Sequence, residues 1–382
     1  MNKKAIAILG GIFILIVGTL GFIIWYRSGS TEEDPVLDNP DVIIEEPIEE
    51  TPIEEPIEEE PVVTNDRAVR LTDDAVITPA LYFQGDGIAY FNNQGQLFRT
   101  QMSISGSTVL LSNKTELVVP PKSNINKILW PIIGNSYLTE SGTGISRTWS
   151  YYNPDTGTYI DLPSQVKSVS WMPSGNKIIF VWVGGDGKAT LNISDPDTNN
   201  YQMLTDLYEP DNEISVSPDG QTILFYRNQM SNTSENKINS VTADGKIFNT
   251  VVRDGYNKGI LWSPDSKKFL FTKLDSSTQK FNLWMADLSS GITKNLGVAT
   301  SETKAVWSKD GQTILAAVPV SGTFGQGLTS DTIYKIDLLT NNRTEYNPGS
   351  GVDVREMFTS LDGGVIFFKN AQDNSLYYLF TQ

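Results

Sequence analysis

The residue types that usually carry enzyme chemistry are scarce in this chain of 382 residues. It contains no histidine and no cysteine, which excludes Ser-His and Cys-His nucleophiles, imidazole and thiolate metal ligands, and disulfides. No Gly-x-Ser-x-Gly elbow, P-loop or dinucleotide-binding turn occurs in the sequence. Carboxylates remain, and a pair of them can cleave glycosides only where both converge on one pocket. We therefore expect a protein that is not an enzyme and that uses no cofactor.

One acidic cluster has the composition of a calcium-binding loop. Asp195, Asp197 and Asn200 lie close together in the sequence. A single short loop supplies too few oxygen ligands for Ca²⁺, which takes about six to eight. Asp195 also falls at the same repeat position as Asp287 and Asp337, where a short carboxylate can accept N–H bonds from a turn. We predict a structural turn and no metal site.

Most of the chain is organised by a short motif that recurs. It reads Trp-Met-Pro-Ser-Gly at 171–175, Val-Ser-Pro-Asp-Gly at 216–220, Trp-Ser-Pro-Asp-Ser at 262–266 and Trp-Ser-Lys-Asp-Gly at 307–311. An apolar run follows each copy, and weaker copies at 81–88, 130–137 and 358–365 bring the number to seven. Strand–turn–strand units with a period of about 46 residues are typical of a β-propeller. The sequence thus predicts an all-β, seven-bladed β-propeller.

Each blade is expected to contain four strands, A to D, in chain order. The last blade supplies strand A at 354–359, B at 365–369 and C at 376–380, after which the sequence ends without a strand D. The segment 67–72, Arg-Ala-Val-Arg-Leu-Thr, precedes the first strand A and has the composition of a strand D. We predict that this N-terminal strand completes blade seven and closes the ring, since an open sheet edge would remain otherwise.

The tryptophans of the motif admit two interpretations. Trp171, Trp262 and Trp307 occupy one equivalent position, at the end of strand A. A repeated aromatic residue there most simply packs between neighbouring blades. The alternative is a platform on which a ligand stacks.

The repeats resemble the TolB-type, WD-like β-propeller family. The resemblance rests on Ser-Pro-Asp-Gly at 217–220, Ser-Pro-Asp at 263–265 and Leu-Trp-Met-Ala-Asp at 283–287, and it covers roughly residues 66–382. It implies the propeller fold and leaves the function open, because one fold hosts many functions. No segment resembles the small α/β domain of TolB, so we expect a protein other than TolB itself.

The N-terminus has the features of a membrane anchor. Residues 1–4 carry Lys3 and Lys4, and the segment 5–26 that follows has no charge and is long enough to span a bilayer as a helix. We predict a transmembrane signal anchor at 5–27 in contact with the lipid bilayer, with residues 1–4 in the cytoplasm and the propeller outside the cell membrane. The alternative is a cleaved signal peptide, although no Ala-x-Ala site closes the apolar run.

Residues 28–65 are predicted to be a disordered linker rich in proline and glutamate. Like-charge repulsion and regularly spaced proline favour an extended spacer between the membrane and the propeller at 66–382. The linker also accounts for most of the net charge of −16. The mildly acidic propeller that remains argues against a nucleic-acid partner, which requires a basic surface.

The loops between strands B and C vary most among the repeats. In four-stranded blades these loops emerge on one face together with the D–A connections, and binding residues often lie on such loops. We predict that this face is the recognition face, with Arg227, Lys273 and Phe324 as contributors. The alternative is that the loops merely tolerate insertion.

These observations leave three hypotheses for function. The first is a membrane-tethered, extracytoplasmic scaffold of the bacterial envelope that binds an unknown protein or polymer without catalysis. The second is a receptor that binds a small ligand in the propeller channel. The third is a carboxylate-dependent enzyme acting on a glycan, which would require acidic side chains that converge in a pocket.

Overall fold

The computed structural model describes residues 62–381 with several short gaps. The gaps are 65–66, 83–84, 118, 121, 123, 144–145, 228–235, 256–258, 276–277, 279 and 323–326. The predicted cytoplasmic segment 1–4, the predicted anchor 5–27 and nearly all of the predicted linker 28–65 lie outside the described residues. Within the described part of the chain there is no helix with the length and apolar content that a bilayer-spanning segment needs.

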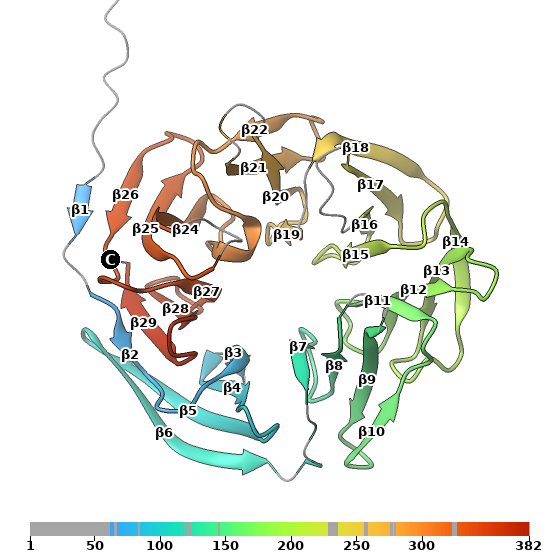
Figure 1. Cartoon of the computed structure of the whole chain (residues 1–382), viewed down its shortest axis with the longest axis horizontal. Helices are drawn as coiled ribbons and strands as arrows, with labels where there is room; N and C mark the ends of the chain where they lie inside the picture. Colours follow the sequence, from blue (N-terminus) through green and yellow to red (C-terminus); the bar gives the residue numbers. More distant parts are fainter. Residues whose placement is uncertain are drawn as a thin grey trace, which may run out of the picture. The chain divides into compact units, whose positions relative to one another are not determined.

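The described residues form seven sheets, antiparallel except for one added strand, arranged as the blades of a propeller, which confirms the predicted all-β, seven-bladed propeller (Figure 1). In order from strand A to strand D, blade one contains β3 (Ile77–Tyr82), β4 (Gly87–Phe91), β5 (Leu97–Ser105) and β6 (Thr108–Leu117), and blade two contains β7 (Ile125–Leu129), β8 (Tyr137–Ser141), β9 (Thr148–Asn153) and β10 (Thr158–Asp161). Blade three contains β11 (Val166–Trp171), β12 (Ile178–Val183), β13 (Ala189–Ser194) and β14 (Gln202–Leu207). Blade four contains β15 (Asn212–Val216), β16 (Thr222–Arg227), β17 (Asn236–Thr242) and β18 (Phe248–Gly255).

Blades 5 to 7 follow the same pattern, with additions at both ends of the described chain. Blade five contains β19 (Leu261–Trp262), β20 (Lys268–Leu274), β21 (Phe281–Asp287) and β22 (Thr293–Asn295). Blade six contains β23 (Ala305–Trp307), β24 (Thr313–Ser321), β25 (Ser330–Asp337) and β26 (Arg343–Tyr346), with β1 (Val62–Thr64) beside β26. Blade seven contains β27 (Val354–Thr359), β28 (Val365–Asn370), β29 (Leu376–Phe380) and β2 (Val69–Arg70). A 3-10 helix, η3 (Glu302–Lys304), precedes β23.

The ring closes as the sequence predicts. Strand β2 pairs antiparallel with β29, with Val69 opposite Tyr378, and the Leu71 amide donates to the Leu376 carbonyl at 2.7 Å. The outer strand of blade seven therefore comes from the N-terminal side of the ring, while its other three strands come from the C-terminal side (Figure 1).

Strand β1 adds a contact that the sequence did not predict. Val62–Thr64 falls inside the range 28–65 that we predicted as linker, yet it pairs in parallel with β26 on the outer edge of blade six. Its β-branched residues fit an extended strand, and the edge of β26 offers unpaired backbone groups. The chain thus contacts two adjacent blades before the first strand A begins.

The apolar core lies between the blades. Among the described residues there are seven clusters of buried apolar side chains, and each joins two neighbouring sheets. The cluster that contains Ile88, Val109, Phe367 and Tyr378 joins blade seven to blade one across the closure. Because each blade buries both faces against its neighbours, its central strands read as continuous apolar runs, such as Ile178–Val183.

The repeated turn between strands A and B owes its sequence to hydrogen bonding. In blade four the Ser217 hydroxyl donates to Asp219 Oδ1 at 2.6 Å and accepts from the Thr222 amide at 3.0 Å. Gly220 has φ +72°, and a Cβ there would lie 3.1 Å from Cδ of Pro173 in the preceding blade. The same Ser–Asp hydrogen bond recurs in the turns of blades five, six and seven. The motif therefore builds turns and packs them against one another.

Candidate functional site

The structure supports the packing interpretation of the tryptophans. Nε1 of Trp171 donates to the Leu129 carbonyl of the preceding blade at 2.8 Å, and Nε1 of Trp307 donates to the Leu261 carbonyl at 3.1 Å. All three repeated indoles are buried, including that of Trp262. Trp171 and Trp307 thus link their own strand A to the strand A of the preceding blade, and Trp262 contributes packing.

The acidic cluster at 195–200 forms a turn, as predicted. Asp195 Oδ1 lies 2.6 Å from the Lys177 ammonium, and Asp195 Oδ2 accepts from the Asn200 amide group at 2.7 Å. Asp197 Oδ1 accepts the backbone N–H of Asn199 at 3.0 Å. The carboxylates are thus engaged with Lys177 and with groups of the turn itself. Among the described residues, no group of three acidic side chains is placed to hold a metal ion.

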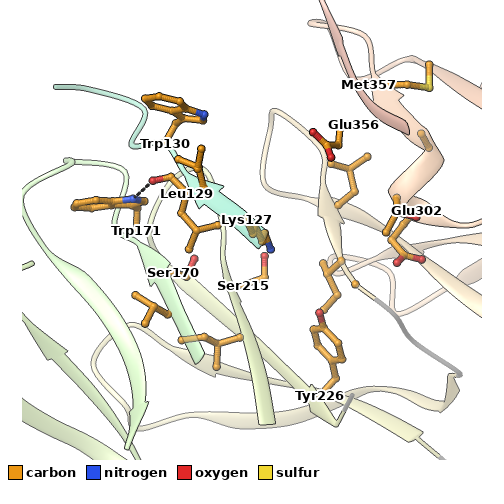
Figure 2. Close-up of a pocket in the computed structure, with 18 residues that line it drawn as sticks. Lys127, Leu129, Trp130, Ser170, Trp171, Ser215, Tyr226, Glu302, Glu356 and Met357 are labelled. Carbon is orange, nitrogen blue, oxygen red and sulfur yellow. Dashed lines mark hydrogen bonds between the residues drawn. The ribbon is translucent and has the colours of Figure 1, made fainter. Parts of the chain in front are cut away.

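A cavity of about 560 Å³ occupies the centre of the ring and is lined by strands A of blades two to seven. Strand A is the innermost edge strand of each of these sheets, so the cavity is bordered by edge strands. Figure 2 shows Lys127 and Ser215 on one side of the cavity and Glu302, Glu356 and Met357 on the other. Charged groups of both signs therefore face a common space.

Glu356 reaches the cavity from an irregular point of β27. The register of β27 against β28 shifts between Arg355 and Phe358, and Glu356 has φ +49°, which is unusual for a residue with a side chain. Its Oε1 accepts from the Lys369 ammonium at 2.8 Å. Its Oε2 is buried and has no hydrogen-bond partner among the described residues. Bulges commonly re-aim a side chain next to a functional site.

Glu302 and Tyr226 line the same cavity and are more deeply buried. Glu302 belongs to η3, and its Oε2 accepts a hydrogen bond from the Thr272 hydroxyl. Burial raises the pKa of Tyr226 well above its usual value, and the nearby carboxylates of Glu213 and Glu302 raise it further. The phenol therefore stays protonated across the physiological range and can donate or accept a hydrogen bond.

A charged network lies beside the cavity where strands A begin. Arg147 forms ion pairs with Glu140, at 3.5 Å from Oε1, and with Glu213. The Ser168 hydroxyl donates to Glu213 Oε2 at 2.9 Å. Burial raises the pKa of Glu140, while the charges of Arg147 and Lys127 oppose that rise. The network joins blades two, three and four.

The residues predicted for the recognition face have separate surroundings. Arg227 ends β16 and holds Asp211, with its Nε 3.0 Å from Oδ1. Lys273 lies in β20 with its ammonium 4.9 Å from the ring centroid of Trp284. Phe324 lies outside the described residues. Their role in recognition stays a prediction.

Sequence reasoning missed the polar residues of the cavity. Lys127, Glu302 and Glu356 lie on or beside strands A, at positions outside the repeat motif. The usable signal was a charged residue within an innermost strand, since that strand borders the channel. The bulge that directs Glu356 has no local sequence mark that we recognise.

A second cavity, of about 730 Å³, lies on blade one and contains Tyr82 and Arg99 among its lining residues. The guanidinium carbon of Arg99 is 3.9 Å from the ring centroid of Tyr82. This stacked pair fills part of the wall with a cation–π contact. The cavity has fewer charged groups than the central one, so we treat the central cavity as the candidate site.

The sequence matches no protein-family model and no curated protein. Solved structures similar to it include an oligogalacturonate lyase from Vibrio parahaemolyticus, with a TM-score of 0.56 and 8% identity over 82% of this chain and 93% of that one. They also include the tricorn protease, with a TM-score of 0.48 and 14% identity over 82% and 34%, and TolB from Acinetobacter baumannii, with 0.43 and 15% over 80% and 78%.

These similarities concern the fold. At 8% identity the likeness to the oligogalacturonate lyase shows a shared β-propeller architecture alone. The chain spans about a third of the tricorn protease, and neither that likeness nor the likeness to TolB is strong enough to add to this conclusion. The shared architecture agrees with the fold implied by the TolB-type repeats.

Proposed function

We propose that this chain is a membrane-tethered, non-enzymatic binding or scaffold protein of the bacterial envelope. Its propeller would lie outside the membrane and bind a protein or polymer. The uncharged segment 5–26, the cationic residues before it and the acidic, proline-rich segment after it support the tether. The propeller is the binding unit.

The main support for this proposal is that the repeated tryptophan, serine and aspartate residues have structural roles. Trp171 and Trp307 donate hydrogen bonds to neighbouring blades, Trp262 is buried, and the Ser–Asp pairs bond within their own turns. These residues form a rigid frame, and their buried or hydrogen-bonded side chains are not presented to a ligand. What varies from blade to blade, the cavity lining and the B–C loops, is then left for recognition.

Membrane attachment can be tested by fractionation of bacteria that express the full chain with a C-terminal tag. We expect the tag in the membrane fraction, and we expect added protease to remove it once the outer layers of the envelope are opened. A variant that lacks residues 1–27 should leave the membrane fraction. Full-length protein found in the cytosol, or protected from protease in intact spheroplasts, would contradict the tether.

Binding through the predicted recognition face can be tested by cross-linking in cells followed by recovery of the tagged chain. Arg227→Ala and Lys273→Ala should reduce the yield of a specific cross-linked species without changing the amount of folded protein. Lys309→Ala, at an exposed position of an A–B turn, is the matched control. Equal yields for all three variants would remove the two residues from the proposal.

The third hypothesis, a glycan-active enzyme, has one supporting observation. Glu302 and Glu356 line the same wall of the cavity (Figure 2), and paired carboxylates are the usual catalytic groups of glycoside cleavage. A test is to incubate the protein with cell-wall and capsular polysaccharides and look for released reducing ends. Release that Glu356→Gln abolishes would favour the enzyme over the binding protein.

A further inference from the structure

The central cavity has a size and position suited to a small molecule. Its volume of about 560 Å³ lies within the roughly 300–1,000 Å³ that is common for ligand sites. Its walls are strands that are fixed by hydrogen bonds to the neighbouring blades: the Val216 amide donates to the Ser170 hydroxyl at 3.2 Å, and Trp171 donates to Leu129. A site built on such strands is largely preformed.

One wall of the cavity calls for a hydrogen-bond donor or a cation. Glu356 uses Oε1 for Lys369, while Oε2 is buried and lacks a partner among the described residues. A buried carboxylate oxygen without a partner costs free energy, which a ligand N–H group would recover. Glu302 lies on the same side and adds a second carboxylate.

The bulge in β27 that holds Glu356 has an equivalent in β3, the strand A of blade one. In β3 the register shifts between Ile77 and Ala80, and Thr78 has φ +44°. There the Thr78 hydroxyl accepts the Ile128 amide and its carbonyl accepts Nε1 of Trp130 at 3.0 Å, so the bulge braces the next blade. The bulge of β27 carries a longer, charged side chain and directs it to the cavity instead.

The opposite wall calls for an anion. Lys127 lies on β7, directly after a register shift, and its side chain is exposed within the cavity. Within the part of the chain that the structure describes, no direct hydrogen bond or ion pair engages its ammonium, although Lys127 lies opposite Glu140 in the β7–β8 pair and its charge acts on that carboxyl. An ammonium that faces a confined space attracts a ligand carboxylate more strongly than one in open solvent.

We propose that the central cavity binds a small zwitterion, a free amino acid or a short peptide. The ligand carboxylate would lie at Lys127 and its ammonium at Glu356. A ligand that is only anionic would face the carboxylates of Glu302 and Glu356, and one that is only cationic would face Lys127. Tyr226 and Met357 offer a phenol and an apolar surface to the rest of the molecule. This proposal rests on the proposed role of the propeller as a binding unit and names a ligand class for it.

The test is isothermal titration calorimetry of the full chain in detergent micelles. The ligands are leucine, the tripeptide Ala-Ala-Ala, and the N-acetylated and C-amidated forms of each. We expect at least one unblocked compound to bind. Blocking either of its ends should lower its affinity by about tenfold or more, because either block removes one charge-assisted contact. Binding of leucine alone points to free amino acids, and binding of the tripeptide alone points to peptides.

Three variants assign the contacts. Glu356→Gln and Lys127→Met should each weaken the unblocked ligand by about tenfold or more. Lys167→Met, on the neighbouring strand A but outside the cavity lining, should leave it unchanged. Lys127 is exposed, so its replacement keeps the test valid should Glu356→Gln impair folding. The proposal is overturned if neither unblocked compound binds, if blocked and unblocked forms bind alike, or if Lys127→Met binds as the unsubstituted chain does. Loss of membrane attachment or of cross-linking would instead count against the broader function.

Discussion

The two rims of the propeller hold their blades together by different means. At the rim where strands A end, the same contacts recur from blade to blade: Ser–Asp turns and indoles such as Trp307 that donate to the preceding blade. At the rim where strands A begin, the contacts are particular to certain blades. Arg147 pairs with two glutamates between blades two and four, and Lys304 lies in a buried ionic cluster between blades six and seven. Repetition thus builds the frame, and individual charges distinguish the blades.

Replacing Lys304 in its buried ionic cluster should cause the largest loss of stability. Its ammonium lies 2.6 Å from Asp331 Oδ2 and 2.8 Å from Asp353 Oδ1, and all three side chains are fully buried. Lys304→Met would leave two buried carboxylates without their shared cation, so we expect a loss of about 3–5 kcal/mol in the free energy of unfolding. Chemical denaturation at neutral pH measures it.

The control for that measurement is Lys309→Met, which removes an exposed lysine from the rim of repeated turns. We expect it to change the free energy of unfolding by less than about 0.5 kcal/mol. Similar losses for the two variants would mean that the buried cluster stabilises the ring no more than an ordinary surface charge does.

The same cluster should make the stability of the ring depend on acid. Burial disfavours the charged form of Asp353, but hydrogen bonds from Arg355, Lys304 and the Thr329 amide outweigh it and lower its pKa to about 2. An unfolded aspartate has a pKa of about 3.9. Because the folded value is the lower one, this stabilisation is present above about pH 4 and is lost as the pH falls toward 2.

Denaturation at a series of pH values from 5 to 2 tests this for the unsubstituted chain and for Asp353→Asn. The variant should be less stable at pH 5, and the difference between the two should shrink as the pH falls. Other turn aspartates such as Asp310, whose pKa is also lowered by hydrogen bonds from Ser308 and the Gln312 amide, affect both proteins alike. A difference that stays constant over this range would show that Asp353 does not ionise as the geometry implies.

The indoles allow a matched comparison within the repeated rim. Nε1 of Trp307 donates to Leu261, whereas Nε1 of Trp262 is buried without a hydrogen-bond partner among the described residues. Replacement by phenylalanine removes similar volume from both sites, but only Trp307→Phe loses a hydrogen bond. We expect Trp307→Phe to cost about 1 kcal/mol more than Trp262→Phe. Equal losses would indicate that packing alone explains the repeated tryptophan.

The contrast between the rims also explains what the sequence could predict. The turn around Ser217 and the indole position of Trp171 return at a fixed spacing, so their structural role and the number of blades can be inferred from one chain. Closure by Val69 could be inferred because blade seven lacks a strand. The positions of Lys304 and Glu356 have no charged equivalent in the repeat motif. The Asp353 partner of Lys304 comes from the next blade, and Glu356 is directed to the cavity by a bulge. The pairing of Val62–Thr64 with β26 has no repeat either, and it was missed.

The smallest loss of stability is expected where an exposed charge is removed from the rim at which strands A begin. Arg227 pairs with Asp211 and Glu209 but keeps about a third of its side chain exposed, and exposed ion pairs contribute only about 0–1 kcal/mol. Arg147 is less exposed and holds two glutamates. We therefore expect Arg147→Ala to destabilise the ring clearly more than Arg227→Ala, and the effect of Arg227→Ala to disappear at high salt, where exposed pairs are screened. If denaturation shows the two losses to be equal, then burial is not what separates the structural charges of this rim from those available to a partner.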